Sequence, residues 1–187
     1  HYDTAWSEIV AIAFMIAGGL PFALFLKAMR GDTWVFFKDT QVRTFFIIVI
    51  STIAIMSIYL VTSHGETIGE ALRRSSFNIV SLITGTGFAN GDYGLWGPFA
   101  VAALFFLMVV GACAGSTTCG IKVFRFQVLH AVIKVQIKKL LQPNGVFIPR
   151  YNGKAIPEGV PASIMSFMFL YVVSFGVIAI ALIVIGL

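Results

Sequence analysis

The residues best suited to bind an ion lie in one short run, Thr84, Gly85, Thr86, Gly87 and Phe88. Potassium filters hold their ions with backbone carbonyl oxygens, which replace the hydration shell. Glycine suits such a strand because it adopts backbone dihedral angles that are closed to other residues. The run therefore predicts a set of backbone carbonyls that bind a cation. The alternative is an ordinary glycine and threonine loop between two short interfacial helices.

The composition indicates that lipid is the solvent of the chain. The 187 residues are 58% hydrophobic and 11% charged, and their mean hydropathy is +0.93. Soluble domains carry roughly a quarter charged residues, so this chain has too little polar surface to be covered by water. Irregular backbone such as the Thr-Gly run does not face lipid, and it must be buried in protein or line a watery cavity.

Three stretches are apolar and long enough for a membrane-spanning helix, which needs about 20 residues: 9–29, 44–63 and 160–187. A fourth, 98–119, is long enough but becomes small and weakly polar in its second half. The apolar run 77–88 is too short to span, which predicts a segment that enters and leaves on one side. The expected fold is an all-α integral membrane protein built on a helix–pore loop–helix unit.

The basic residues predict the orientation of these segments. Eleven of the 13 lysines and arginines lie either from the end of 9–29 to the start of 44–63 or between 98–119 and 160–187. The positive-inside rule makes those loops cytoplasmic and leaves the N-terminus outside. The net charge of +5 is thus a topology signal with an attraction to membrane lipid, and we expect no nucleic-acid partner.

A helix start signal precedes the Thr-Gly run. Thr67 and Glu70 fit a capping box, which predicts a helix over about 68–83 that points into the membrane. The C-terminal end of a helix carries about half a negative charge, so this end favours a cation. The residues 90–92 then predict a turn back to the outer surface. Asp92 is either an ordinary turn residue or a carboxylate that concentrates cations at the mouth of a pathway.

A second unusual stretch is the glycine-rich loop, which we define as residues 111–120. Its members are Gly111, Ala112, Cys113, Ala114, Gly115, Ser116, Thr117, Thr118, Cys119 and Gly120. Glycine costs about 1 kcal/mol relative to alanine inside a helix, so its three glycines predict a break in a helix over 98–126. The alternative is close packing of small residues between membrane helices. Both cysteines are expected to be buried free thiols.

Lysines follow the glycine-rich loop in a stretch that predicts an amphipathic helix at the membrane surface. Lys134, Lys138 and Lys139 are either a solvated face or a docking surface for a cytosolic regulator. A membrane scaffold that docks a partner without conducting ions is therefore an alternative function. The sequence shows no Ser–His–Asp set, carboxylate pair, phosphate-binding glycine loop or metal-ligand cluster, so we expect no catalytic residues, no enzyme activity and no cofactor.

Three motifs together resemble the TrkH/Ktr/HKT superfamily of potassium transporters, and its bacterial TrkH branch most closely. The residues 16–22 resemble the inner helix that closes the second repeat of that family, and 81–88 resemble the filter of the third repeat. The residues 111–122 are similar to the broken inner helix of the same third repeat. The resemblance covers nearly the whole chain.

The resemblance implies how the chain is divided. The family carries four helix–loop–helix repeats whose four loops form one filter, so we expect this chain to be a fragment around the third repeat. The expected parts are the last helix of the preceding repeat (1–30), a cytoplasmic loop (31–43), one complete repeat (44–126), a cytoplasmic basic helix and loop (127–159) and the first helix of the next repeat (160–187). Within the complete repeat, 68–83 would be the pore helix, 84–89 the filter and 98–126 the inner helix, broken at 111–120.

The resemblance also implies roles for residues. K⁺, as the substrate ion, would bind at Thr86 and Gly87, with further carbonyls from Thr84, while Phe88 takes the aromatic place after the filter glycine. Gly85 stands where the family often has threonine, which weakens any side-chain role there. The glycine-rich loop would be a gate that obstructs the pore beneath the filter.

The same resemblance implies the setting and the partners. The expected function is potassium uptake across the inner membrane of a bacterium, either channel-like or coupled to protons or sodium. The expected partner is a cytosolic nucleotide-binding ring protein of the TrkA type, and a homodimer is the expected assembly.

Overall fold

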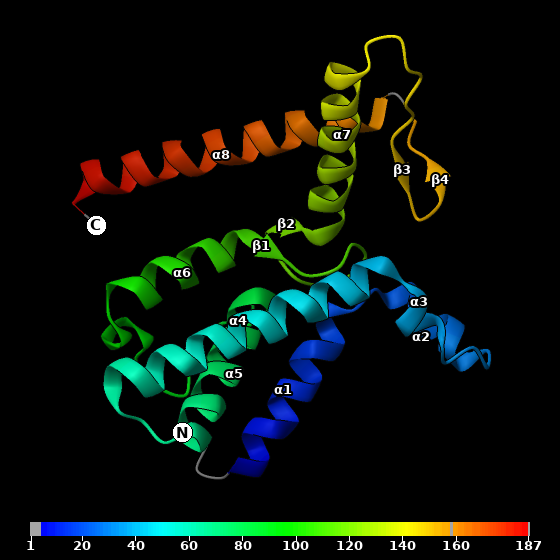
Figure 1. Cartoon of the computed structure of the whole chain (residues 1–187). Helices are drawn as coiled ribbons and strands as arrows, with labels where there is room; N and C mark the ends of the chain where they lie inside the picture. The colour runs from blue at the N-terminus through cyan, green and yellow to red at the C-terminus, as the bar shows by residue number, and fades with distance from the viewer. Residues whose placement is uncertain (1–4, 158, 187) are drawn as a thin grey trace. The chain divides into compact units, whose positions relative to one another are not determined.

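The computed structural model describes residues 5–157 and 159–186. The chain divides into two compact units, His1–Phe124 and Arg125–Leu187, and Figure 1 shows that helices build most of both. The sequence predicts an outer N-terminus and a last span that runs to Leu187. Residues 1–4 and Leu187 lie outside the described residues.

The first unit begins with two helices, α1 (Ala5–Gly19) and α2 (Phe22–Met29), which meet at an angle of 97°. The sequence predicts one continuous span over 9–29, and the structure corrects this to a broken one. Pro21 precedes α2 in an extended conformation. Proline has no amide hydrogen to donate and disfavours helical geometry at the residue before it, so the chain turns at this point.

A short helix, α3 (Val35–Lys38), leads into α4 (Thr40–His64), which is long and apolar enough to cross a membrane. The carboxylate of Asp39 caps α4 by accepting hydrogen bonds from the amides of Gln41 at 2.8 Å and Val42 at 3.3 Å. Such a cap satisfies amides that have no partner within the helix. The helix ends at Gly65, which has a positive φ of 66°.

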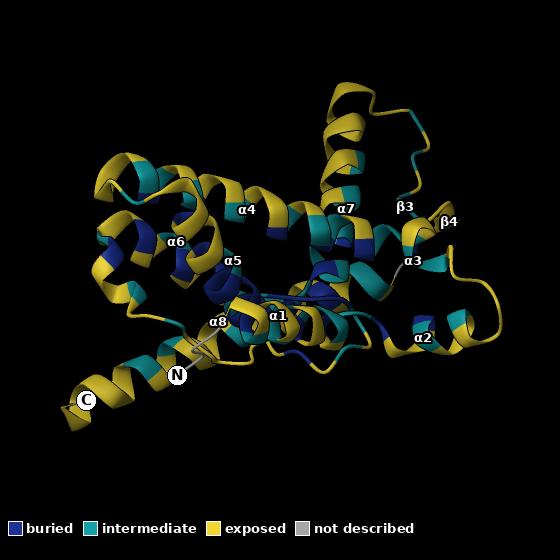
Figure 2. Ribbon diagram, turned by 90° about the horizontal axis from the view of Figure 1, so that it is seen from below, coloured by how far each residue is buried: buried dark blue, intermediate teal, exposed yellow. Residues whose placement is uncertain are grey.

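The centre of the first unit is α5 (Ile68–Thr84), which packs against α1, α4 and α6. The hydroxyl of Thr67 caps the start of α5 by accepting from the amide of Glu70 at 3.4 Å. Figure 2 shows buried residues gathered on α5, and its second half contributes the fully buried Phe77 and Ile79. Helix α5 is therefore surrounded by protein on several sides.

After α5 come the short helix η1 (Tyr93–Trp96) and α6 (Pro98–Val109). Two parallel strands follow, β1 (Val110–Gly111) and β2 (Ile121–Lys122), and they enclose most of the glycine-rich loop. Helix α7 (Val123–Leu141) begins directly after β2. The backbone between 98 and 126 thus leaves the helical conformation from residue 110 to residue 122.

The second unit contains most of α7, an antiparallel hairpin of β3 (Arg150–Tyr151) and β4 (Lys154–Ala155), and α8 (Gly159–Ile185). The guanidinium of Arg125 lies 3.6 Å from the centre of the Phe167 ring. Apolar side chains are exposed along the whole of α8. Within the described residues, α4 and α8 are long and apolar enough to cross a membrane, and the bent pair α1–α2 would make a third span.

Candidate functional site

The Thr-Gly run begins where α5 ends. Gly85 follows α5 with a positive φ of 69°. Its amide donates to the carbonyl of Leu82 at 3.1 Å, and the amide of Thr86 donates to that of Ser81 at 3.0 Å. These bonds satisfy the last carbonyls of α5, in the manner of a Schellman motif. The amides at the start of the run therefore serve the helix end.

The two threonine hydroxyls of the run are also turned toward the helix. Thr84 Oγ1 donates to the carbonyl of Val80 at 2.7 Å and lies 2.8 Å from Thr86 Oγ1. Because a hydroxyl has a single proton, the proton of Thr84 goes to Val80, and Thr86 is the donor in the threonine pair. The threonine side chains thus bind to α5 and to each other. The backbone carbonyls of the Thr-Gly run are the groups to consider as cation ligands.

Gly87 is required by its backbone conformation rather than by crowding. Its φ is +79°, a region that residues with side chains rarely adopt, and a Cβ added to it would meet no atom within 4 Å. The residues 85–89 are exposed in this chain. The strand therefore presents an open side on which further protein or an ion can lie.

The glycine-rich loop lies beside the start of the run. A Cβ added to Gly85 would lie 3.5 Å from the amide nitrogen of Cys119, which is ordinary contact distance. A Cβ added to Gly19 would lie 3.3 Å from the Cβ of Ala112 and 3.4 Å from Cγ2 of Thr84. The fold therefore brings together the two segments that the sequence singles out, and Gly19 of α1 lies where they meet.

The same loop is docked on the corner between α1 and α2. The amide of Cys113 donates to the carbonyl of Gly19 at 3.2 Å, and the amide of Phe22 donates to the carbonyl of Gly115 at 3.0 Å. The side chain of Gln41 accepts from the amide of Ala114 at 2.9 Å. Helix ends leave backbone groups without partners in the helix, and at this corner the loop supplies partners. Backbone groups of the α1–α2 corner and of the glycine-rich loop therefore form hydrogen bonds with each other.

Two of the loop glycines are required by the strand pairing. A Cβ added to Gly111 would lie 2.2 Å from the carbonyl oxygen of Cys119, and one added to Gly120 would lie 2.9 Å from the amide nitrogen of Gly111. Both distances are too short for real atoms. Glycine at these positions thus allows β1 and β2 to approach each other.

The Lys122 side chain folds back onto the loop. Its ammonium donates to the hydroxyl and carbonyl oxygens of Ser116 and Thr118. The sequence places Lys122 among the cytoplasmic charges and at the end of the 111–122 motif, and it does not predict this contact. The signal available in the sequence is a lysine four residues after Thr118, close enough to reach back to the turn.

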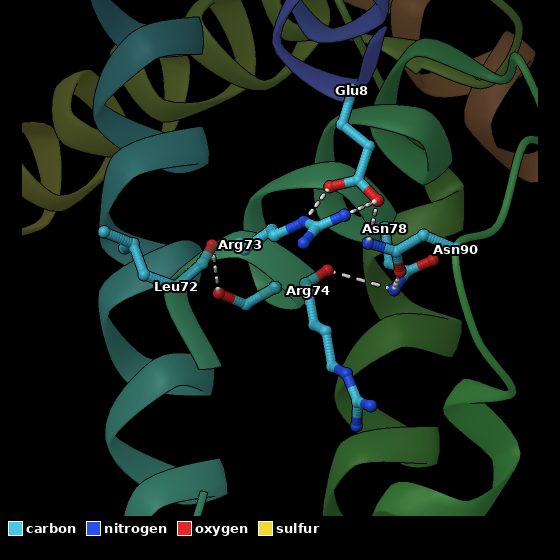
Figure 3. A network of polar contacts seen from close by, with 7 residues as sticks. Glu8, Leu72, Arg73, Arg74, Asn78 and Asn90 are labelled. Carbon is cyan, nitrogen blue, oxygen red and sulfur yellow. Dashed lines mark hydrogen bonds and ion pairs between the residues drawn. The ribbon is translucent and has the colours of Figure 1, made fainter. Parts of the chain in front are cut away.

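A polar network joins α1, α5 and Asn90, close to the end of the run (Figure 3). Arg73 Nε donates to Glu8 Oε2 at 2.5 Å, and Arg73 Nη2 donates to Glu8 Oε1 at 3.0 Å. The amide of Asn78 donates to Oδ1 of Asn90 at 2.8 Å, and Asn90 Nδ2 lies 3.5 Å from the Glu8 carboxylate. A cavity of about 200 Å³ opens here. Asn90 lies two residues after Phe88, so this network holds the backbone that follows the Thr-Gly run.

Sequence reasoning missed this network. It places Arg73 and Arg74 on the predicted half-helix, but it assigns them no partners. The available signal is Glu8, a carboxylate in an apolar segment, because ionisable residues in such segments are rare and usually paired. Arg74 pairs instead with Glu66, at 2.8 Å.

Two further expectations concern single residues. Cys113 is buried as predicted, whereas Cys119 is exposed, so the expectation of two buried thiols is wrong for the second. Cys119 lies at the end of the loop, where the backbone approaches β1 and the side chain is not enclosed. Asp92 Oδ1 accepts from the amide of Gly94 at 2.8 Å, which is the hydrogen bond of a turn residue.

Metal-ligand side chains do not gather elsewhere: among residues 5–157 and 159–186, no group of three His, Cys, Asp or Glu residues could hold a metal ion. Lys134, Lys138 and Lys139 are exposed on α7 in the second unit.

Comparison with known proteins gives one consistent family. The family model for TrkH, described as a cation transport protein, matches residues 1–185. The Trk system potassium uptake protein TrkI of Halomonas elongata is 35% identical over 174 residues, which are 93% of this chain and 35% of that protein. The Trk system potassium uptake protein TrkH of Escherichia coli K12 is 27% identical over 192 residues, covering 100% of this chain and 39% of that protein.

A solved structure shows the same fold. The crystal structure of the potassium transporter TrkH from Vibrio parahaemolyticus superposes with a TM-score of 0.92 at 26% identity. The match covers 100% of this chain and 41% of that one. The chain therefore spans about two fifths of the length of the relatives that it matches.

Proposed function

The chain belongs to the TrkH family of cation transport proteins, and on that premise we propose that it supplies one quarter of a potassium filter. Members of the family are ion transporters, and the long apolar helices identify this chain as part of a multi-pass membrane protein. The proposed activity is potassium uptake through a pathway in which residues 84–89 form one of four loops. The proposed location is a bacterial inner membrane, with the basic loops in the cytoplasm.

The observation that carries the proposal is that the amides and a hydroxyl of the Thr-Gly run bind to the end of α5. The amides of Gly85 and Thr86 and the hydroxyl of Thr84 bind to carbonyls of α5, and we propose that the carbonyls of Thr86 and Gly87 bind the ion. The strand follows the C-terminal end of α5, whose dipole favours a cation. We place K⁺ against the carbonyls of Thr86 and Gly87, where the strand has an open side.

The second part of the proposal concerns the glycine-rich loop. Its residue Cys119 lies in contact with Gly85, directly beside the inner end of the proposed filter strand. A loop in that place obstructs a pathway that continues beyond the strand. Its backbone is not helical, and between β1 and β2 it is held by hydrogen bonds to Gly18, Gly19 and Phe22 at the α1–α2 corner and to Gln41. We therefore propose that this loop is the gate.

The third part concerns partners. The basic face of α7 carries Lys134, Lys138 and Lys139, and we propose that it docks a cytosolic nucleotide-binding ring protein of the TrkA type. The proposed assembly is a homodimer. A scaffold that only docks this partner is the competing function, and complementation separates the two, because a scaffold does not restore growth to a strain that lacks potassium uptake.

The filter is tested by replacing Gly87 with serine in the intact protein and measuring K⁺ and Na⁺ flux in proteoliposomes. The positive φ of Gly87 is strained for any side chain, so the carbonyls move and the preference for K⁺ falls. Gly91→Ser is the matched control, because Gly91 is also exposed and uncrowded but lacks a positive φ. Unchanged selectivity in Gly87→Ser would remove the filter assignment.

A further inference from the structure

We propose that the turn at Ser116–Thr118 is a second cation site, which the Lys122 ammonium occupies as a tethered cation while the loop is in the observed conformation. The proposal rests on the proposed function, because K⁺ transport supplies the ion that would replace the ammonium in the turn. It goes further in naming a second set of ligands and a competitor for them.

Four oxygens converge on the ammonium. The carbonyl oxygen and the hydroxyl of Ser116 lie 3.4 and 3.3 Å from Lys122 Nζ. The hydroxyl of Thr118 lies 2.8 Å away, and the carbonyl oxygen of Thr118 is also in contact. Carbonyl and hydroxyl oxygens are hard ligands of the kind that replace the hydration shell of K⁺. The turn is therefore chemically suited to an ion of single positive charge.

The hydroxyl protons are directed away from the site. Ser116 Oγ donates to the carbonyl of Cys113 at 2.6 Å, which uses its single proton. Ser116 Oγ and Thr118 Oγ1 lie 2.8 Å apart, so the proton between them comes from Thr118. Both oxygens are then left with lone pairs for the ammonium, which only donates. This arrangement suits a cation.

Pairing of β1 with β2 fixes the backbone position of Lys122. Lys122 is paired in register with Gly111 in the two-strand ladder, and its side chain is half-buried. A partly buried charge needs partners, and the loop oxygens provide them. If the loop moved, the Lys122 ammonium would lose its oxygen partners. If the ammonium moved away, the four oxygens would lose their cation. Lys122 therefore stabilises the loop in the observed position.

A transported ion can take over the same ligands. K⁺ and the ammonium carry the same charge and cannot occupy the four oxygens together. When K⁺ enters the turn, the lysine is displaced from its four oxygens and the loop loses one of its anchors. Opening of the proposed gate is thus coupled to the arrival of an ion from the filter strand beside it.

The test uses the intact protein and Rb⁺, which replaces K⁺ and is located by its anomalous scattering. Lys122→Met removes the charge and keeps the length of the side chain. We expect a Rb⁺ peak at Ser116 and Thr118 in this variant and none in the wild type. We also expect Rb⁺ flux in proteoliposomes to rise by roughly tenfold, since hydrogen bonds to a charged group shift an equilibrium by about that factor or more.

Two further variants make the result specific. Lys154→Met removes an exposed lysine of β4 and should change neither the peak nor the flux. Thr118→Val, which keeps the shape and deletes one ligand, should raise flux by a smaller factor without any change to the lysine, and should abolish the loop peak when combined with Lys122→Met.

The filter peak separates the two proposals. A Rb⁺ peak at Thr86 and Gly87 together with an empty loop in Lys122→Met would overturn the second site and leave the filter intact. An absent filter peak in every protein would overturn the proposed function itself. Flux that stays at the wild-type level in both Lys122→Met and Thr118→Val would show that the lysine does not hold the loop.

Discussion

Glu8 of α1 holds Arg73 of α5 through two hydrogen bonds, at 2.5 and 3.0 Å, although the two residues are 65 positions apart. The Glu8 side chain is 4% exposed, whereas that of Arg73 is 47% exposed. The same carboxylate faces the amide of Asn90. Helix α1 thus holds Asn90, which follows the proposed filter segment.

This relationship makes the first prediction. Replacing Glu8 with glutamine in the intact protein removes the charge that orients the Arg73 guanidinium, and it weakens the contact with Asn90. The outer end of the strand becomes more mobile, and we expect a several-fold loss of K⁺ preference over Na⁺ in flux measurements, with total cation flux retained. Glu66→Gln is the control, because it breaks the other arginine pair on α5, whose Arg74 is exposed. Equal selectivity in the two variants would contradict the prediction.

The second prediction concerns the strand pair that encloses the glycine-rich loop. Replacing Gly111 with alanine places a Cβ within 2.2 Å of the Cys119 carbonyl oxygen, so the backbone must shift. Overpacking of this kind costs typically about 1–3 kcal/mol, and we expect a lower midpoint of thermal unfolding in detergent. The loop is displaced as well, so we expect altered flux.

Gly69→Ala is the control for this prediction. A Cβ added to Gly69 on α5 would meet nothing within 4 Å, and alanine favours a helix by about 1 kcal/mol over glycine. The unfolding midpoint should therefore stay constant or rise. A midpoint that falls equally in both variants would show that the close approach of β1 and β2 is not the cause.

Local signals in the sequence predict part of this structure. The capping box at Thr67 and Glu70 predicts a helix that starts at residue 68, and α5 starts at Ile68. The glycines of 111–120 predict a break, and the backbone there is not helical. In both cases the cause lies within a few residues of its effect. The roles of these segments as filter and gate remain proposals.

The features that the sequence does not predict depend on residues far apart in the chain. The break at Pro21 is tolerated because Phe22 finds the carbonyl of Gly115, and nothing near Pro21 in the sequence shows that partner. The burial of Glu8 likewise depends on Arg73.

The last prediction concerns the anchor of the proposed gate on α4. Gln41 Oε1 accepts from the amide of Ala114 at 2.9 Å, and this is a contact between the glycine-rich loop and the first turn of α4. Gln41→Leu keeps the volume and removes the acceptor. An amide left without a partner costs about 1–3 kcal/mol, which weakens the docked position of the loop, so Rb⁺ flux should rise roughly tenfold while selectivity is kept. Gln41→Glu retains an acceptor at the N-terminal end of α4, where a negative charge is favourable, and its flux should stay at the wild-type level. Equal flux in all three folded proteins would show that this hydrogen bond holds the loop in place without controlling the pathway.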